Sequence, residues 1–426
     1  MTRRSPAVFA VALAAGACLG LPGCSRRDAP EAPEAPAIPA APSSSPASSA
    51  SPAESGVVGP ARVRVEPTSK RARVFDLPFR AVDVAAGAAP SRDLPLGTLV
   101  LAKVADEGFA LVEWDPAAGR TIREVTHLHQ PGSGVQVGNV RSLTRAGSGF
   151  AYATTGHEDP SPIELWIVGP DLAKKHHRVI DVPTVDARRL SLHGSGETLV
   201  LSYCAGGEHH VATFDVPSGA VVGRRKLGRK LALCVGFTTP LADARVVGSS
   251  IWSITGGVGD YEVLMLGRDL RRVLQRRPIP TPGLSADARA SAIDEGDFPR
   301  FDATPSRMAW NTRGELRVSK LDGATPIWKG RVDPTSISTD AGEPGGPQEN
   351  DFPIAVDPET AAALLGDGTW YAADGAATRV FRAHEEQPAL APVPVQHQRR
   401  VTFSHGRGVF LGVSPEAATL VLVEPE

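Results

Sequence analysis

The chain has 426 residues and a formal net charge of −2, because 45 Lys and Arg residues nearly balance 47 Asp and Glu residues. A balance this close to zero gives no support for nucleic acid as a partner, since that function needs a strongly basic surface. Aromatic residues make up 5% of the chain, so the stacking platforms of a sugar-binding surface are not obvious either.

Residues 1–23 have the organisation of a secretory signal. Two arginines precede an uncharged apolar run from Pro6 to Gly20, which is short for a membrane span. The next four residues, Leu21-Pro22-Gly23-Cys24, resemble the lipobox of bacterial lipoproteins, in which the cysteine becomes the lipid-bearing N-terminus. We therefore expect export and lipidation at Cys24, giving a protein anchored in the bacterial cell envelope that faces the periplasm or the cell exterior. There are two alternatives. One is an ordinary cleaved signal in which Cys24 is incidental, and the other is lipidation at Cys18.

Residues 24–60 have the composition of a disordered linker. Pro, Ala and Ser dominate, and proline recurs at every third residue from Pro30 to Pro42, which is the period of polyproline II. Such a segment cannot bury enough apolar surface to offset its ordering entropy. We expect a semi-rigid spacer that lifts a folded domain off the bilayer. A proline-rich recognition motif is the alternative.

Residues 61–426 show short apolar runs paired around turns, and only Ala361–Leu365 has a pattern that suits a helical turn. The turns contain an aspartate at positions 115, 171, 215, 269, 322 and 374, and Pro415 takes the corresponding place in a last, shorter unit. Two motifs also recur near this period: Gly206-Gly207 with Gly256-Gly257, and Asp297-Phe298-Pro299 with Asp351-Phe352-Pro353. Seven units of about fifty residues predict an all-β domain, a seven-bladed β-propeller of four-stranded blades.

One unit carries a family resemblance. A strand with Tyr203 leads into Gly206-Gly207, and the next strand runs into Asp215-Val216-Pro217. This pattern resembles a kelch-type blade and, more widely, the bacterial periplasmic propellers. Arg224 and Arg225 stand where kelch repeats place a tryptophan, which favours a divergent propeller. The resemblance implies a ring of blades around a channel, with binding at one mouth and no particular activity.

The first and last blades of a propeller must hide the sheet edges between them. Val401–Val423 has room for about three strands, and the apolar alternating segments Ala61–Val65 and Arg73–Phe79 precede the first full unit. We therefore expect one N-terminal segment to complete the last blade. A separate N-terminal hairpin is the alternative.

Two cysteines remain after removal of the signal peptide and use of Cys24 for lipid, namely Cys204 and Cys234. Disulfides persist in exported proteins, so a bridge between these two is expected. Two free, buried thiols are the alternative.

Two acidic segments lie one repeat apart, the first with Asp294, Glu295, Asp297 and Asp302 and the second with Glu349, Asp351 and Asp357. Equivalent loops of neighbouring blades share a face, so these carboxylates are candidates for binding a basic partner or Ca²⁺. No other cofactor is expected. Alternatively, the aspartates simply start turns by bonding their own backbone.

No nucleophile elbow, phosphate-binding loop or HExxH motif is present in the sequence. His127 and His129 would point to one face of a strand, as metal ligands can, but solvated strand ends are the expected place for the histidines. The function expected is therefore binding or scaffolding of an envelope protein, peptide or glycan. An envelope hydrolase or lyase with an acidic channel-mouth site is the alternative, which His405 within reach of Asp297 or Asp351 would favour.

Overall fold

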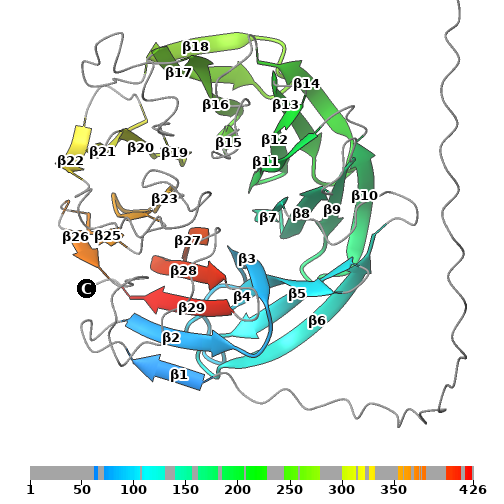
Figure 1. Ribbon diagram of the computed structural model, residues 1–426, viewed down its shortest axis with the longest axis vertical. Coiled ribbons are helices and arrows are strands. Elements are labelled where there is room, and N and C mark those ends of the chain that lie inside the picture. Colours follow the sequence, from blue (N-terminus) through cyan, green and yellow to red (C-terminus); the bar gives the residue numbers. More distant parts are fainter. Residues whose placement is uncertain are drawn as a thin grey trace, which may run out of the picture. The chain divides into compact units, whose positions relative to one another are not determined.

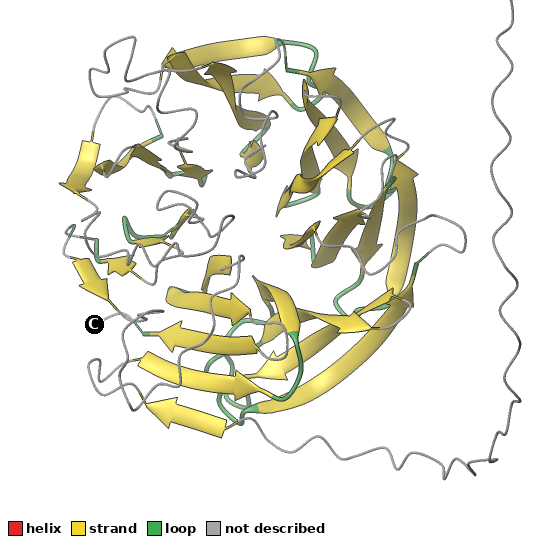
Figure 2. Cartoon of the chain, viewed as in Figure 1, coloured by secondary structure: helices red, strands yellow, loops and turns green. Residues whose placement is uncertain are grey.

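Seven β-sheets follow one another as blades around a ring in a computed structural model of the protein (Figure 1). The chain divides into residues 1–56 and 57–426, and the structure describes only the second unit. The description covers residues 62–424 without 66–71, 106–107, 130–139, 156–161, 181–184, 206–207, 228–243, 258–259, 279–299, 313–314, 322–325, 332–353, 358, 366–368, 374, 376, 380–399 and 414–417. Strands and loops make up all of the described residues (Figure 2).

The first six blades each contain four consecutive strands, running from the inside of the ring to its outside. Blade 1 is β3 (Ala81–Ala86), β4 (Leu99–Ala105), β5 (Gly108–Asp115) and β6 (Arg120–Leu128). Blade 2 is β7 (Val140–Ala146), β8 (Gly149–Thr155), β9 (Ile163–Val168) and β10 (Lys174–Ile180). Blade 3 is β11 (Val185–Ser195), β12 (Thr198–Ala205), β13 (Glu208–Asp215) and β14 (Val221–Lys226).

The next four blades complete the ring. Blade 4 is β15 (Ala244–Val247), β16 (Ser250–Gly257), β17 (Asp260–Gly267) and β18 (Val273–Pro278). Blade 5 is β19 (Arg300–Ala303), β20 (Arg307–Thr312), β21 (Glu315–Lys320) and β22 (Pro326–Arg331). Blade 6 is β23 (Ile354–Val356), β24 (Ala363–Leu365), β25 (Thr369–Tyr371) and β26 (Ala377–Arg379). Blade 7 has β27 (Arg400–Ser404), β28 (Arg407–Val413) and β29 (Ala418–Val423) from the C-terminus. The all-β, seven-bladed propeller predicted from the repeat is therefore confirmed, and Ala363–Leu365 is strand where a helical turn was considered.

Blade 7 is closed by the start of the domain. Strand β2 (Ala72–Leu77) pairs antiparallel with β29, and β1 (Arg62–Val65) adds a fifth strand outside it. The closure expected from the sequence is confirmed, and the alternative of a separate hairpin is wrong. The inner strand β27 contacts β3 of blade 1, so the ring is continuous.

Four of the six repeated aspartates form turns between the third and fourth strands of blades 1 to 4, and the other two, Asp322 and Asp374, lie outside the described residues. In blade 1, Asp115 Oδ1 accepts hydrogen bonds from the backbone N–H groups of Ala117 and Ala118. Asp171, Asp215 and Asp269 accept equivalent bonds in the next three blades. A carboxylate that bonds its own backbone two or three residues on is a local turn signal, which is why the repeat was visible in the sequence.

The turn at Pro415 does not correspond to the turns that contain the repeated aspartates. Pro415 lies between β28 and β29, which are the second and third strands of blade 7. Blade 7 takes its fourth strand from the N-terminus, so it has no covalent turn at the repeated position. This is the reason that the last spacing along the chain is shorter than the others.

The core lies between the faces of neighbouring blades. Strands β8, β9 and β12 are buried along their whole length, so both of their faces are covered. At the closure, Phe75 of β2 meets Trp114 of blade 1 edge to face, with ring centroids 4.9 Å apart. In these antiparallel sheets the first and third strands end at the same face of the ring. This face contains the turns that follow those two strands, and we call it the turn face.

Candidate functional site

Two of the seven carboxylates in the two acidic segments fall within the described part of the chain. Asp302 lies in the inner strand β19, and Asp357 directly follows the inner strand β23. Asp294, Glu295, Asp297 and Asp351, together with Glu349, lie outside the described residues. The two Asp-Phe-Pro motifs directly precede β19 and β23, which are the inner strands of consecutive blades.

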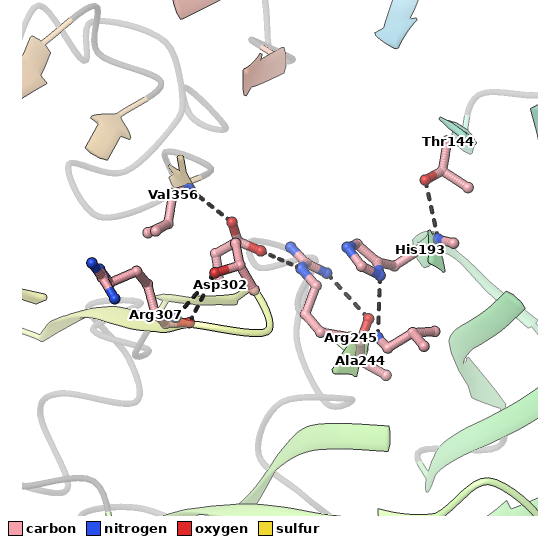
Figure 3. Close-up of polar contacts among 10 residues, drawn as sticks. Thr144, His193, Ala244, Arg245, Asp302, Arg307 and Val356 are labelled. Carbon is pink, nitrogen blue, oxygen red and sulfur yellow. Dashed lines mark hydrogen bonds and ion pairs between the residues drawn. The ribbon is translucent and has the colours of Figure 1, made fainter. Parts of the chain in front are cut away.

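Asp302 connects three blades (Figure 3). Its Oδ1 accepts a hydrogen bond from Arg245 Nε of blade 4 at 2.6 Å, and its Oδ2 accepts one from the backbone N–H of Val356 in blade 6 at 2.8 Å. Both side chains of the ion pair are largely buried. Arg245 neutralises the carboxylate, and both carboxylate oxygens have partners within the chain, so Asp302 acts as a joint between blades.

The same kind of joint recurs around the inner strands. In blade 1, Asp83 Oδ2 accepts from the N–H of Leu143 in blade 2, at 2.7 Å. Farther round, a side chain of one inner strand again accepts from the next inner strand's backbone: Ser142 from Leu192, Thr144 from Gly194, and His193 from Val246, each at 3.1 Å. A buried N–H needs a partner, and these side chains supply it where two sheets cannot pair directly.

Asp357 forms a turn. Its Oδ1 accepts from the N–H of Glu359, its Oδ2 accepts from the hydroxyl of Thr360, and its own N–H donates to the carbonyl of Ala362. This is the turn-forming role that the sequence left open for the acidic residues. Asp357 lies at the turn face, whereas β19 and β23 begin at the opposite face.

His405, the histidine named for a catalytic alternative, occupies the tight turn between β27 and β28 with φ of 52°. That turn also lies at the turn face. Asp297 and Asp351 are outside the described residues, so the proximity to His405 that an enzyme would need stays untested.

Cys204 is buried in β12 and is disulfide-bonded. Cys234 lies outside the described residues, so the pairing of these two cysteines stays a prediction. Cys24 and the rest of the signal and linker also lie outside them.

A buried carboxylate that sequence reasoning missed lies between blades 1 and 2. Glu164 of β9 is fully buried, and its Oε2 is 3.1 Å from His129 Nδ1 and 3.5 Å from His177 Nε2. His177 stacks on Trp166 with centroids 4.5 Å apart. The one signal in the sequence was a single Glu within the apolar run Ile163–Val168.

The positions of His127 and His129 agree with strand geometry. His127 and His129 both contact Phe109 and therefore share a face, as expected. His127 is buried in place of the solvated position that we expected. Desolvation lowers the pKa of His127 and of His177, because burial disfavours the imidazolium form.

Two further histidines are neutral structural groups. His209 is buried and lies 2.7 Å from Ser202 Oγ, and burial lowers its pKa to about 3. The pKa of His193 is also lowered to about 3, first by burial and then by the nearby positive charge of Arg245. A neutral His193 keeps the lone pair on Nδ1 that accepts from Val246.

Within the described ranges, no three His, Cys, Asp or Glu side chains are grouped as a metal site. The same part of the chain contains no helix with the length and apolar character needed to cross a membrane.

No protein-family model matches the chain, and no curated protein matches it in sequence. Solved structures are similar in fold. The β-propeller domain of the trilobed protease from Pyrococcus furiosus is 9% identical, with a TM-score of 0.42 over 82% of this chain and 97% of that chain. The Dos1 propeller is 8% identical, with a TM-score of 0.41 over 86% and 92% of the two chains. Hsv2 of Kluyveromyces lactis is 11% identical, with a TM-score of 0.40 over 78% and 89%. The chain's own seven sheets define it as a seven-bladed β-propeller, and identities this low say nothing about its ligand.

Proposed function

We propose that this protein is a lipid-anchored binding or scaffold module of the bacterial cell envelope, whose propeller holds a protein, peptide or glycan partner. The lipobox-like residues that end at Cys24 and the proline-rich linker support the anchor. The kelch-like pattern from Tyr203 to Asp215 supports the comparison with propellers that bind at a mouth of the ring.

The observation that carries the proposal is the set of inner joints from Asp83 to Asp302. They fix neighbouring blades to one another with buried polar bonds, and the strand β2 closes the ring. Binding residues are commonly carried on loops that a rigid scaffold positions. A ring built in this way is such a scaffold, with a series of loops presented at each of its faces.

The acidic segments are the proposed contact region. Asp302 and Asp357 have structural roles, so the residues that we propose for contact with the partner are Asp294, Glu295, Asp297 and Asp351. Their charge would favour a basic partner or Ca²⁺. The corresponding experiment compares the double variant Asp297→Asn/Asp351→Asn with the matched control Asp93→Asn, which removes an exposed carboxylate from the loop between β3 and β4.

We expect the double variant to recover less of the crosslinked envelope partner and to lose a Ca²⁺-dependent rise in melting temperature, while the control keeps both. Unchanged capture and unchanged melting in the double variant would contradict the acidic site. The anchor is tested separately: intact mass should show a diacylglycerol group on Cys24, and a Cys24→Ala variant that stays equally membrane-bound would refute it. Non-reducing peptide mapping should recover Cys204 joined to Cys234, and two free thiols would refute that pair.

A further inference from the structure

The outer strands of blades 1 to 4 concentrate positive charge. Strands β6, β10, β14 and β18 together contain ten Lys or Arg residues and one Glu. The whole chain has a net charge of −2, so this charge is segregated. The basic runs lie far apart along the sequence, but they take the same place in successive blades. Figure 1 shows the four strands following one another around the outside of the ring. We call these strands the basic wall.

Part of this charge joins the blades. The guanidinium groups of Arg178, Arg225 and Arg277 donate to turn carbonyls of the following blade, at Gly219, Leu270 and Leu321. Three further cations of the basic wall pair with glutamates of the neighbouring third strands, and others are exposed to solvent. Arg120, Lys174, Lys175 and Arg224 are exposed, and no described carboxylate lies in ion-pair contact with them.

Exposed apolar side chains lie on the same strands. Leu128 of β6 is 64% exposed and Leu274 of β18 is 56% exposed. Ile122, Val221 and Val222 are also exposed. Basic residues on an edge strand often have no role beyond preventing that strand from pairing with another sheet. Exposed apolar side chains beside them would promote such pairing, so edge protection does not explain this combination. Cations for phosphate groups combined with apolar side chains for the interface are the composition of a surface that binds anionic lipid.

We propose that the basic wall docks onto an anionic lipid bilayer. This inference rests on the proposed function, because the lipid on Cys24 and the linker would bring the propeller to a membrane. The linker spans roughly 100 Å when extended at about 3 Å per residue, so it allows the wall to turn toward the bilayer. The lipid-anchored linker would also raise the local concentration of the basic wall at the bilayer, so that even a weak contact between them persists. The wall is convex, so neighbouring strands such as β10 and β14 make contact together.

Binding of the unlipidated chain to vesicles tests the proposal. All seven sheets are built from residues 62–423, so a chain that begins at Ser25 retains the whole fold. We expect it to sediment with vesicles of one third phosphatidylglycerol in phosphatidylcholine and not with phosphatidylcholine alone. Added salt at about 1 M should release it, because it screens exposed charges beyond about 3 Å.

Charge reversal locates the surface. Each basic residue near an anionic membrane strengthens binding about fivefold, so the triple variant Lys174→Glu/Lys175→Glu/Arg224→Glu, confined to β10 and β14, should bind at least tenfold more weakly. The matched control Arg80→Glu/Arg92→Glu/Lys320→Glu makes the same charge change at exposed positions outside the basic wall and should stay within about twofold of the parent. A Gln version of the triple variant provides a second test if the Glu version unfolds.

Three results would overturn the proposal: equal binding to neutral vesicles, equal loss in the triple variant and its control, or tighter binding to a DNA duplex than to the anionic vesicles at the same salt. The assay uses no lipid anchor, so its failure leaves the mass of the Cys24 adduct as an independent test of the proposed function. Absence of that adduct would in turn leave the vesicle result standing.

Discussion

The inner and the outer strands of the ring join the blades by different chemistry. At the inside, side chains such as Asp83, Ser142 and His193 accept hydrogen bonds from the buried backbone of the next blade. At the outside, Arg178 and Arg225 reach across to turn carbonyls through hydrogen bonds that are only partly shielded from solvent. Loss of an inner acceptor leaves a buried N–H without a partner, whereas water can replace an outer donor. Bonds of similar length therefore contribute very unequally to stability.

The largest expected effect comes from the closing strand β2, which joins two blades by apolar packing. Strand β2 joins blade 7 to blade 1 through the buried ring of Phe75, which packs on Trp114. We expect Phe75→Ala to lower the free energy of unfolding by about 3–5 kcal/mol, measured by urea denaturation. Arg73→Ala on the same strand, an exposed position paired with Glu424, should cost less than about 1 kcal/mol. Equal costs would show that the closure does not depend on apolar packing.

The next effect tests the inner joints at Asp302. Asp302→Ala should lower the free energy of unfolding by about 3 kcal/mol, because the largely buried Arg245 loses its ion pair with Asp302 and the Val356 N–H loses its acceptor. Asp302→Asn keeps an acceptor for Val356 and should cost less. Urea denaturation of both variants, with Asp93→Ala as the exposed control, measures the difference. A cost for Asp302→Ala no larger than that of the control would remove the distinction between inner and outer joints.

A third effect is absent at neutral pH, appears only on acidification and concerns the buried His209. Its pKa is about 3 in the folded protein, against 6.5 for an unperturbed histidine, so between these values the unfolded chain binds the extra proton. The stability that neutral His209 contributes is therefore fully present above about pH 6.5. It falls as the pH drops toward 3, by up to about 1.4 kcal/mol per pH unit.

Denaturation of His209→Gln across this range should show a shallower loss of stability than the parent. Ser202→Ala removes the hydroxyl beside His209 but keeps the buried imidazole, so its slope should match the parent. An unchanged slope in His209→Gln would show that His209 is already protonated or solvated in the folded protein.

The smallest effect is expected at an outer joint. Arg225 donates to the carbonyls of Leu270 and Arg271 at 2.8 and 3.0 Å, close to solvent. We expect Arg225→Ala to lower the free energy of unfolding by about 1 kcal/mol or less, since water can take over the released carbonyls. Thermal denaturation of this variant beside Asp302→Ala compares the two edges directly, and a larger loss at Arg225 would reverse the ranking.

The number of blades could be predicted from the sequence because the turns between the third and fourth strands of blades 1 to 4 contain a local signal. Asp115, Asp171, Asp215 and Asp269 bond residues two or three positions on, so their spacing records the blades without any knowledge of tertiary structure. The last unit was read differently because β2 supplies its fourth strand from the other end of the chain. A local pattern at Pro415 cannot carry that information.

The joints between blades could not be predicted in the same way. Asp83 and Leu143 are 60 residues apart, and nothing near Asp83 distinguishes its carboxylate from one in a loop. Asp302 shows the consequence: its acidic neighbourhood suggested a binding role, and the structure assigns it to Arg245 and Val356. Glu164 was missed for the same reason, because His129 and His177 come from two different blades.

The pairing of β2 with β29 also sets the order in which the ring can form. It joins residues more than 340 positions apart, from Ala72 with Val423 to Leu77 with Ala418. A chain that emerges N-terminus first must keep Val74 and Phe75 from other partners until its last strand arrives. Contacts at such a separation close slowly, and open strand edges aggregate meanwhile. Closure of the ring thus requires a chain that extends to β29, and in a chain that stops earlier the edge of β2 lacks the partner that it has here.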